Sequence, residues 1–177
     1  MKLEKIWAVY FSGTGTTRRT VERIAGGIAS PLNLPAESVD FSRPAVRQET
    51  LGFGEKDLVV FGTPVYAGRV PNVLLPFLRE RIVGGGALAV PVVLFGNRNY
   101  DDALMELSQL LTAGGFTCGG GGAFVGEHSF SRTLGAGRPN GADEAEMDAF
   151  ADGLAAKLRA GDTAAVTVGG CDPIRPY

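Results

Sequence analysis

The chain has 177 residues, 45% of them hydrophobic, and a formal net charge of −2. This length is enough for one globular domain with a substantial core. The nearly neutral charge gives no electrostatic reason to expect binding to nucleic acid or to an anionic membrane surface.

The apolar runs of the chain are short, and its metal-binding residue types are few. No run approaches the roughly 18 apolar residues of a membrane-spanning helix. Cys118 and Cys171 are far apart and form no metal or redox motif, and His128 is the single histidine. We therefore expect a cytoplasmic protein with reduced thiols and no metal.

Apolar runs alternate with helical patterns along the first 160 residues. Strands are predicted at residues 6–11, 38–41, 57–61, 87–95 and 117–126, and the first, third and fourth of them read as buried. Helices are predicted at residues 18–29, after an N-cap at Asn72, from Asp101 or Asp102 to residue 113, and at residues 143–159. Pro91 suggests an irregularity in the fourth strand, and four consecutive glycines place the fifth at the sheet edge. The alternation predicts an α/β fold, a doubly wound five-stranded parallel sheet with helices on both faces.

The segment between the first strand and the first helix has the composition of a phosphate site. Its residues are Ser12, Gly13, Thr14, Gly15, Thr16 and Thr17. Glycines bring backbone N–H groups close to an anion, the helix N-terminus adds its dipole, and hydroxyls donate hydrogen bonds. The segment lacks the lysine of a Walker A loop, and Arg18 stands where a dinucleotide fingerprint has its third glycine. These features suit a terminal phosphate monoester, although a hydroxyl-capped helix after a tight turn has a similar sequence.

Two further loops follow the third and fourth strands, at the same edge of the sheet. Counting the Ser12–Thr17 segment as the first loop of the site, the candidate binding residues on the second loop are Thr63, Pro64, Val65, Tyr66, Ala67 and Gly68. Those on the third loop are Gly96, Asn97, Arg98 and Tyr100. A flat heterocycle needs aromatic faces and backbone groups for its edge. Tyr66 and Tyr100 are the predicted stacking residues, and Gly62, Gly68 and Gly96 are predicted to let the backbone approach the ring.

Four segments in order resemble the flavodoxin family, and in particular the flavodoxin-like domain of proteins that fuse a flavodoxin module to a bacterial-type ferredoxin. The segments are residues 9–17, 62–71, 96–104 and 126–131. The resemblance implies the flavodoxin-like strand order 2-1-3-4-5 and FMN bound non-covalently. The phosphate would lie on residues 12–17, and the ring would lie between the second and third loops.

The resemblance also implies a partner. In the fusion proteins an iron–sulfur part follows the flavodoxin part, but this chain has no cysteine run that ligates a cluster. Residues 171–177 resemble the connecting segment. We therefore expect a flavodoxin-like domain at residues 1–160 and a tail at residues 161–177 that leads, in a longer protein, to a ferredoxin-type domain.

The expected function is an FMN-binding electron-transfer module. One alternative is a stand-alone FMN-dependent NAD(P)H:quinone-type reductase, and another is a non-redox binding domain with a vestigial flavin site. Arg69 and Arg98 lie in the ring-flanking loops, where cations would stabilise the reduced, anionic flavin. His128 and the loop at residues 127–142 lie beyond the fifth strand, on the ligand side, and can contribute to a substrate pocket.

Overall fold

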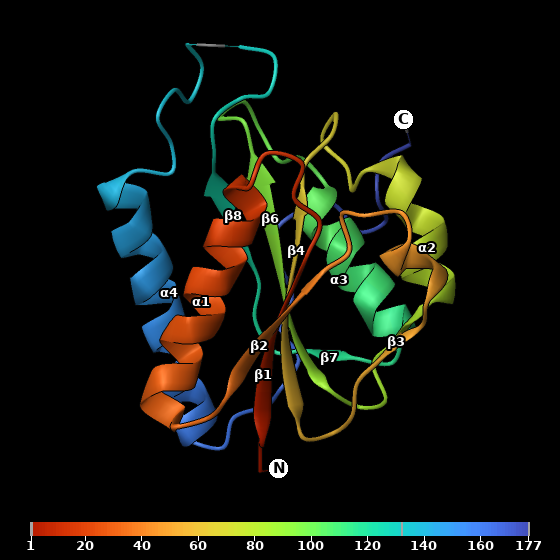
Figure 1. The fold of residues 1–177 in the computed structure, drawn as a ribbon, viewed down its shortest axis with the longest axis vertical. Helices are drawn as coiled ribbons and strands as arrows, with labels where there is room; N and C mark the ends of the chain where they lie inside the picture. The colour runs from red at the N-terminus through yellow and green to blue at the C-terminus, as the bar shows by residue number, and fades with distance from the viewer. Residues whose placement is uncertain (1, 132, 177) are drawn as a thin grey trace.

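A parallel sheet forms the centre of the protein (Figure 1). The computed structural model describes residues 2–131 and 133–176. The sheet contains β1 (Lys5–Tyr10), β2 (Ala36–Asp40), β4 (Asp57–Pro64), β6 (Leu88–Phe95), β7 (Thr117–Cys118) and β8 (Gly122–Val125). Its order is β2-β1-β4-β6, and β7 and β8 both pair with the outer side of β6. The predicted order 2-1-3-4-5 is confirmed, with the fifth strand divided into two pieces.

The division of the fifth strand coincides with the irregularity predicted at Pro91. β7 pairs with Leu88 and Ala89, whereas β8 pairs with residues 92–95 of β6. Pro91 lies between these two stretches and has no N–H to donate. Opposite it the chain passes through Gly119, Gly120 and Gly121 without strand pairing. The glycine run therefore interrupts an edge strand.

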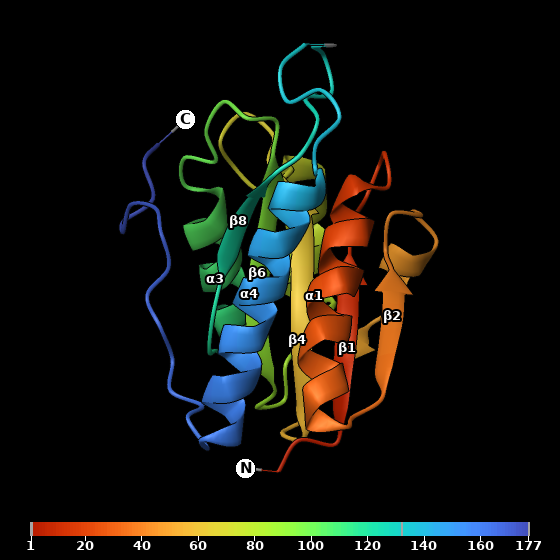
Figure 2. The same ribbon diagram turned by 90° about the vertical axis from the view of Figure 1, so that its left-hand side faces the viewer.

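Helices cover both faces of the sheet, as predicted (Figure 2). α1 (Thr16–Leu32) and α4 (Gly141–Arg159) lie side by side on one face, and α2 (Leu75–Glu80) and α3 (Ala103–Ala113) lie on the other. Short 3-10 helices occupy Val46–Gln48 and Asn72–Leu74. A small separate sheet pairs β3 (Leu51–Gly52) with β5 (Ile82–Val83). In the part of the chain that the structure describes, no helix is both long and apolar enough to cross a membrane.

Two predicted helix boundaries are wrong. α1 continues through Pro31 and ends at Leu32. The C-cap is Asn33, whose left-handed backbone (φ 52°) directs its N–H to the Ala29 and Ser30 carbonyls. Asn72 does not cap α2, because it forms part of the 3-10 turn and α2 begins three residues later. α4 has a side-chain cap. The Asn140 side chain accepts hydrogen bonds from the N–H groups of Ala142 and Asp143.

The packing of α1 on α4 gives a test with two neighbouring glycines. A Cβ on Gly27 would lie 2.8 Å from the Ala151 Cβ of α4, whereas a Cβ on Gly26 would meet nothing within 4 Å. Both substitutions to alanine gain helix propensity, about 1 kcal/mol. We expect Gly26→Ala to raise the free energy of unfolding by about this amount. We expect Gly27→Ala to lower it by about 1–3 kcal/mol, because the helices must separate. Urea unfolding of both variants measures the difference, and equal effects would contradict the packing.

Candidate functional site

The loop after β1 is held in shape by its own first hydroxyl. The Ser12 Oγ accepts a hydrogen bond from the N–H of Arg18 at 3.1 Å, and the Ser12 N–H donates to the Ser42 Oγ at 2.8 Å. Gly15, with φ 86°, turns the chain into α1 and occupies the N-cap position without a side-chain cap. With the Arg18 N–H already bonded, Thr16 and Thr17, the first two residues of α1, have N–H groups without an acceptor in the helix, and these can donate to a ligand.

Three of the four predicted phosphate-binding hydroxyls line a pocket. They belong to Thr14, Thr16 and Thr17, and the hydroxyls of Thr14 and Thr16 lie 3.1 Å apart. In this hydroxyl pair one group donates to the other, so the second keeps its own proton for a ligand. Thr17 is buried, and its methyl group packs close to Gly62 of β4. The combination of hydroxyls and helix N–H groups is a set of uncharged donors of the kind that binds anions.

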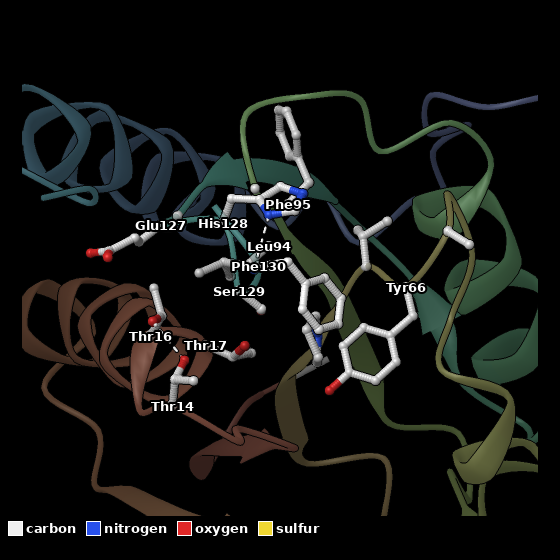
Figure 3. Close-up of a pocket in the computed structure, with 15 residues that line it drawn as sticks. Thr14, Thr16, Thr17, Tyr66, Leu94, Phe95, Glu127, His128, Ser129 and Phe130 are labelled. Atoms are coloured by element: carbon white, nitrogen blue, oxygen red, sulfur yellow. Dashed lines mark hydrogen bonds between the residues drawn. The ribbon is translucent and has the colours of Figure 1, made fainter. Parts of the chain in front are cut away.

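The pocket extends from these threonines across the carboxyl ends of β4 and β6, and its volume is about 480 Å³. Figure 3 shows the threonines on one side, Tyr66 on another, and His128 between them along the upper wall. The lining residues are Thr14, Thr16, Thr17, Pro64, Val65, Tyr66, Ala67, Leu94, Phe95, Gly96, Gly126, Glu127, His128, Ser129 and Phe130. A hydroxyl-lined end and a mostly apolar, aromatic end fit a phosphate monoester joined to a flat ring, and the volume is in the usual range for small-ligand sites.

The second loop contributes a tight turn to the pocket. The N–H groups of Tyr66 and Arg69 donate to each other's carbonyls at 2.9 and 3.0 Å. Ala67 at the turn has a left-handed backbone with φ 50°. Tyr66 lines the pocket and is 49% exposed, so part of its side chain is open to contact with a ligand. Its predicted stacking role remains a prediction that this placement permits.

The structure does not bring every predicted site residue to the pocket. The residues outside its lining are Ser12, Gly13, Gly15, Thr63, Gly68, Asn97, Arg98 and Tyr100. Thr63 is completely buried in the sheet, and its hydroxyl has no partner there. The Tyr100 ring packs on Phe95 with centroids 5.6 Å apart, and its hydroxyl lies beside Gly169 of the tail.

The three glycines assigned to the ring have other neighbours. A Cβ on Gly62 would overlap the Val21 methyl group of α1, and one on Gly68 would overlap the Asp101 carboxylate. A Cβ on Gly96 would lie 2.6 Å from the His128 Cδ2. The absent side chains therefore make room for protein, and of the three only Gly96 also lines the pocket.

The segment after β8 forms a larger part of the pocket than the sequence indicated. Residues 126–130 line it, and Phe130 is 97% exposed at its mouth. The His128 Nδ1 accepts hydrogen bonds from the N–H groups of Phe130 and Ser131 at 3.1 and 3.2 Å. Since Nδ1 is the acceptor, the neutral ring carries its proton on Nε2. The sequence placed His128 and residues 127–142 on the ligand side but assigned none of them to the cofactor site.

Arg69, expected as a cation beside the ring, is paired with a carboxylate and does not line the pocket. It forms a two-point ion pair with Glu106 of α3, with N–O distances of 2.9 and 2.6 Å. The two side chains are only 15% and 6% exposed, and Glu106 also accepts the Val70 N–H. The charge of Arg69 is therefore balanced on the α3 side of the sheet. Arg98 stays exposed at the third loop.

The last residue of β1, just before the loop at residues 12–17, is a tyrosine with a shifted pKa. Burial and the hydrogen bond to Glu22 (2.9 Å) raise the pKa of Tyr10 to about 12. Above pH 10 the unfolded chain loses this proton while the folded chain keeps it, so the free energy of unfolding falls between pH 10 and about 12. We expect phenolate absorbance to show one late-titrating tyrosine that is missing in Tyr10→Phe. A late step that persists in the variant would contradict the assignment.

The geometry of this fold is similar to that of several solved structures. No protein-family profile matches the chain, and no curated protein is similar in sequence. Solved structures do match. A flavodoxin from the domain Archaea is 17% identical over 88% of this chain and 99% of its own, with a TM-score of 0.61. The flavodoxin of Streptococcus pneumonia TIGR4 is 21% identical with the same coverage and a TM-score of 0.57. An NADH:FMN oxidoreductase (EMOB) in its apo form is 15% identical over 87% of this chain and 89% of its own, with a TM-score of 0.54.

The similarity to these structures extends over nearly all of the sheet and its helices, at identities that establish the fold and not the activity. The strand order is the one expected, and the pocket lies at the carboxyl ends of the strands where the order reverses. The chain therefore has the flavodoxin-like fold.

Proposed function

We propose that the chain binds FMN non-covalently in the pocket between the Thr14–Thr17 turn and Tyr66, and serves as an electron-transfer module. The observation that carries the proposal is the polarity of this one pocket. Hydroxyls and helix N–H groups lie at one end, and Tyr66, Phe95 and Phe130 lie at the other. FMN, when bound, supplies one- and two-electron transfer. The residues of the chain hold its phosphate, flank its ring and limit the access of water.

A visible spectrum of the purified protein, followed by titration of the flavin-free protein with FMN, riboflavin and FAD, tests the proposal. We expect FMN to bind more tightly than riboflavin, because only FMN presents a phosphate to the threonines. FAD carries a second nucleotide half, for which the lined volume of about 480 Å³ leaves little room. Failure to take up any flavin would favour the alternative of a non-redox binding domain with a vestigial site.

The proposed redox partner is a ferredoxin-type iron–sulfur domain or protein. The tail supports this proposal, because residues 161–176 return to the end of the sheet that bears the pocket (Figure 1). An attached domain would then begin close to the flavin. Tyr177, the last residue of the segment that resembles the connection to the iron–sulfur part, lies outside the described residues.

The proposal includes the cytoplasmic location expected from the sequence.

A second candidate function is an FMN-dependent NAD(P)H:quinone-type reductase. The open mouth favours it, since Phe130 is 97% and Tyr66 49% exposed and a second planar molecule can reach the ring there. The similar structure named NADH:FMN oxidoreductase adds support. Stopped-flow mixing of the FMN-loaded protein with NADH separates the two candidates. Fast direct reduction favours the reductase, and slow reduction favours a carrier that depends on a protein donor.

The exposed Arg98 is expected to make the second reduction potential of the flavin less negative. Its charge would stabilise the reduced anion by about 1 kcal/mol or less, because solvent screens it. Arg98→Ala is therefore expected to lower this potential slightly, and the difference should shrink in high salt. Arg79 of α2 is exposed and outside the pocket lining, so Arg79→Ala is the control. Redox titration measures both, and an unchanged or raised potential in Arg98→Ala contradicts the effect.

A further inference from the structure

The C-terminal tail runs back along the molecule instead of leaving it. From the end of α4 it passes the edge of the sheet and α3 and reaches the end where the loops lie (Figures 1 and 2). The Val166 N–H donates to the Cys118 carbonyl of β7 at 2.9 Å. A Cβ on Gly121 would lie 2.6 Å from a Val168 methyl group. The tail thus covers the interrupted edge strand before it reaches the loops.

The far end of the tail is fixed by a buried carboxylate at the start of α3. The Asp102 side chain is 3% exposed and accepts four hydrogen bonds from the tail. Arg175 donates through Nε and Nη2, both at 2.9 Å, and through its backbone N–H at 3.3 Å, while the Cys171 N–H donates at 3.0 Å. The Arg175 guanidinium, followed by the Cys171 N–H, holds the pKa of Asp102 well below its usual range. The contact is therefore an ion pair throughout the physiological pH range.

The hydrogen bonds of Asp102 with Arg175 and Cys171, called the clamp below, join the second and third loops at the ring end of the pocket. The Asp102 N–H donates to the Gly68 carbonyl at 3.0 Å, which connects the third loop to the second. The Arg175 carbonyl accepts a hydrogen bond from the Arg69 Nη1 at 3.1 Å, on the second loop. A Cβ on Gly169 would lie 2.6 Å from the Tyr100 hydroxyl of the third loop. One tail segment therefore contacts both loops, each of which continues into pocket-lining residues.

We propose that residues 161–176 form a strap, and that Arg175 is a positioning residue that orders the second and third loops for the flavin ring. This inference rests on the proposed FMN site and goes beyond it. Arg175 does not line the pocket and acts through Asp102 and Arg69. Loops that are ordered before binding lose less conformational entropy when the ligand arrives. Loss of the clamp should weaken flavin binding without altering the phosphate end.

The first arm of the test needs no flavin. Backbone amide hydrogen exchange in the flavin-free protein reports on Tyr66, Arg69 and Asp102, whose N–H groups bond within or between the loops. Arg175→Ala is expected to speed exchange at these amides. The matched control is Arg23→Ala. Like Arg175, Arg23 donates two guanidinium hydrogen bonds to one carboxylate, that of Asp148, but it lies on the α1–α4 face. This substitution should leave the loop amides unchanged.

The second arm measures affinity for FMN and for riboflavin. Arg175→Ala is expected to weaken both by the same factor, roughly tenfold, because the ring end is common to both ligands. Arg175→Lys should restore only part of the loss, since an ammonium keeps the charge but not the two-point geometry. Arg23→Ala, which merely lowers stability, should change neither affinity.

The possible outcomes separate the strap from the flavin site. Unchanged exchange in Arg175→Ala overturns the strap, and so does faster exchange with unchanged affinity for both flavins. Loss of FMN affinity alone also overturns it, because the defect would then lie at the phosphate end. If the wild-type protein binds no flavin, the proposed function fails and the positioning role fails with it. The exchange arm then still decides whether the tail orders the loops.

Discussion

Replacement of Thr17 by valine is expected to weaken FMN binding by roughly 10- to 100-fold and to leave riboflavin binding unchanged. Thr17 lines the pocket in the first turn of α1, where its hydroxyl can donate to a phosphate. A hydrogen bond to a charged group contributes about 1.5–3 kcal/mol, which corresponds to this range of affinity. Valine keeps the shape of threonine and the methyl packing against Gly62, so the fold should not change. Fluorescence titration with the two flavins measures the difference.

Thr20, one turn further along α1, provides the matched control. Its hydroxyl is buried and has no hydrogen-bond partner, and the residue does not line the pocket. Thr20→Val should leave FMN affinity unchanged and should stabilise the protein slightly, because it removes an unsatisfied polar group. Equal losses of FMN and riboflavin affinity in Thr17→Val would show that the ring end, and not the phosphate, depends on this residue.

The fold was predictable because its signals are local. Apolar runs buried on both faces identify parallel strands, and the glycine- and hydroxyl-rich turn marks where the first strand meets its helix. The strand order followed from the resemblance, and the interruption at Pro91 followed from a missing backbone donor. The helix boundary at Pro31 was missed, because a proline in the last turn is compatible with a helix that Asn33 ends.

The candidate site was predictable only in part, because side-chain direction depends on distant partners. From their positions in the loops after the third and fourth strands, Arg69 and Tyr100 were predicted to lie beside the flavin ring. The structure directs Arg69 to Glu106, which is 37 residues away, and Tyr100 to Phe95 and the tail. Phe95, the last residue of the strand predicted at residues 87–95, forms a pocket wall. His128, which was expected on the ligand side, lines the pocket, and Gly96 leaves room for its ring.

The ion pair between Arg69 and Glu106 provides the second large prediction. Glu106→Ala is expected to lower the free energy of unfolding by about 3 kcal/mol, because a poorly solvated guanidinium and the Val70 N–H both lose their acceptor. For a chain of this length the midpoint of thermal unfolding should fall by roughly 6–12 °C. Thermal and urea unfolding monitored by circular dichroism measure the change.

Glu4 is the matched control, because its carboxylate lies 2.6 Å from the Lys56 Nζ, the same distance as the shorter Arg69–Glu106 contact. Both members of that pair are more than half exposed, so solvent already screens the interaction and Glu4→Ala should leave the midpoint almost unchanged. The double variant Arg69→Met/Glu106→Leu removes both charges and should recover much of the stability that Glu106→Ala loses. If the double variant is no more stable than Glu106→Ala, then the cost arises from lost packing around α3 and not from removal of the carboxylate beside the Arg69 guanidinium.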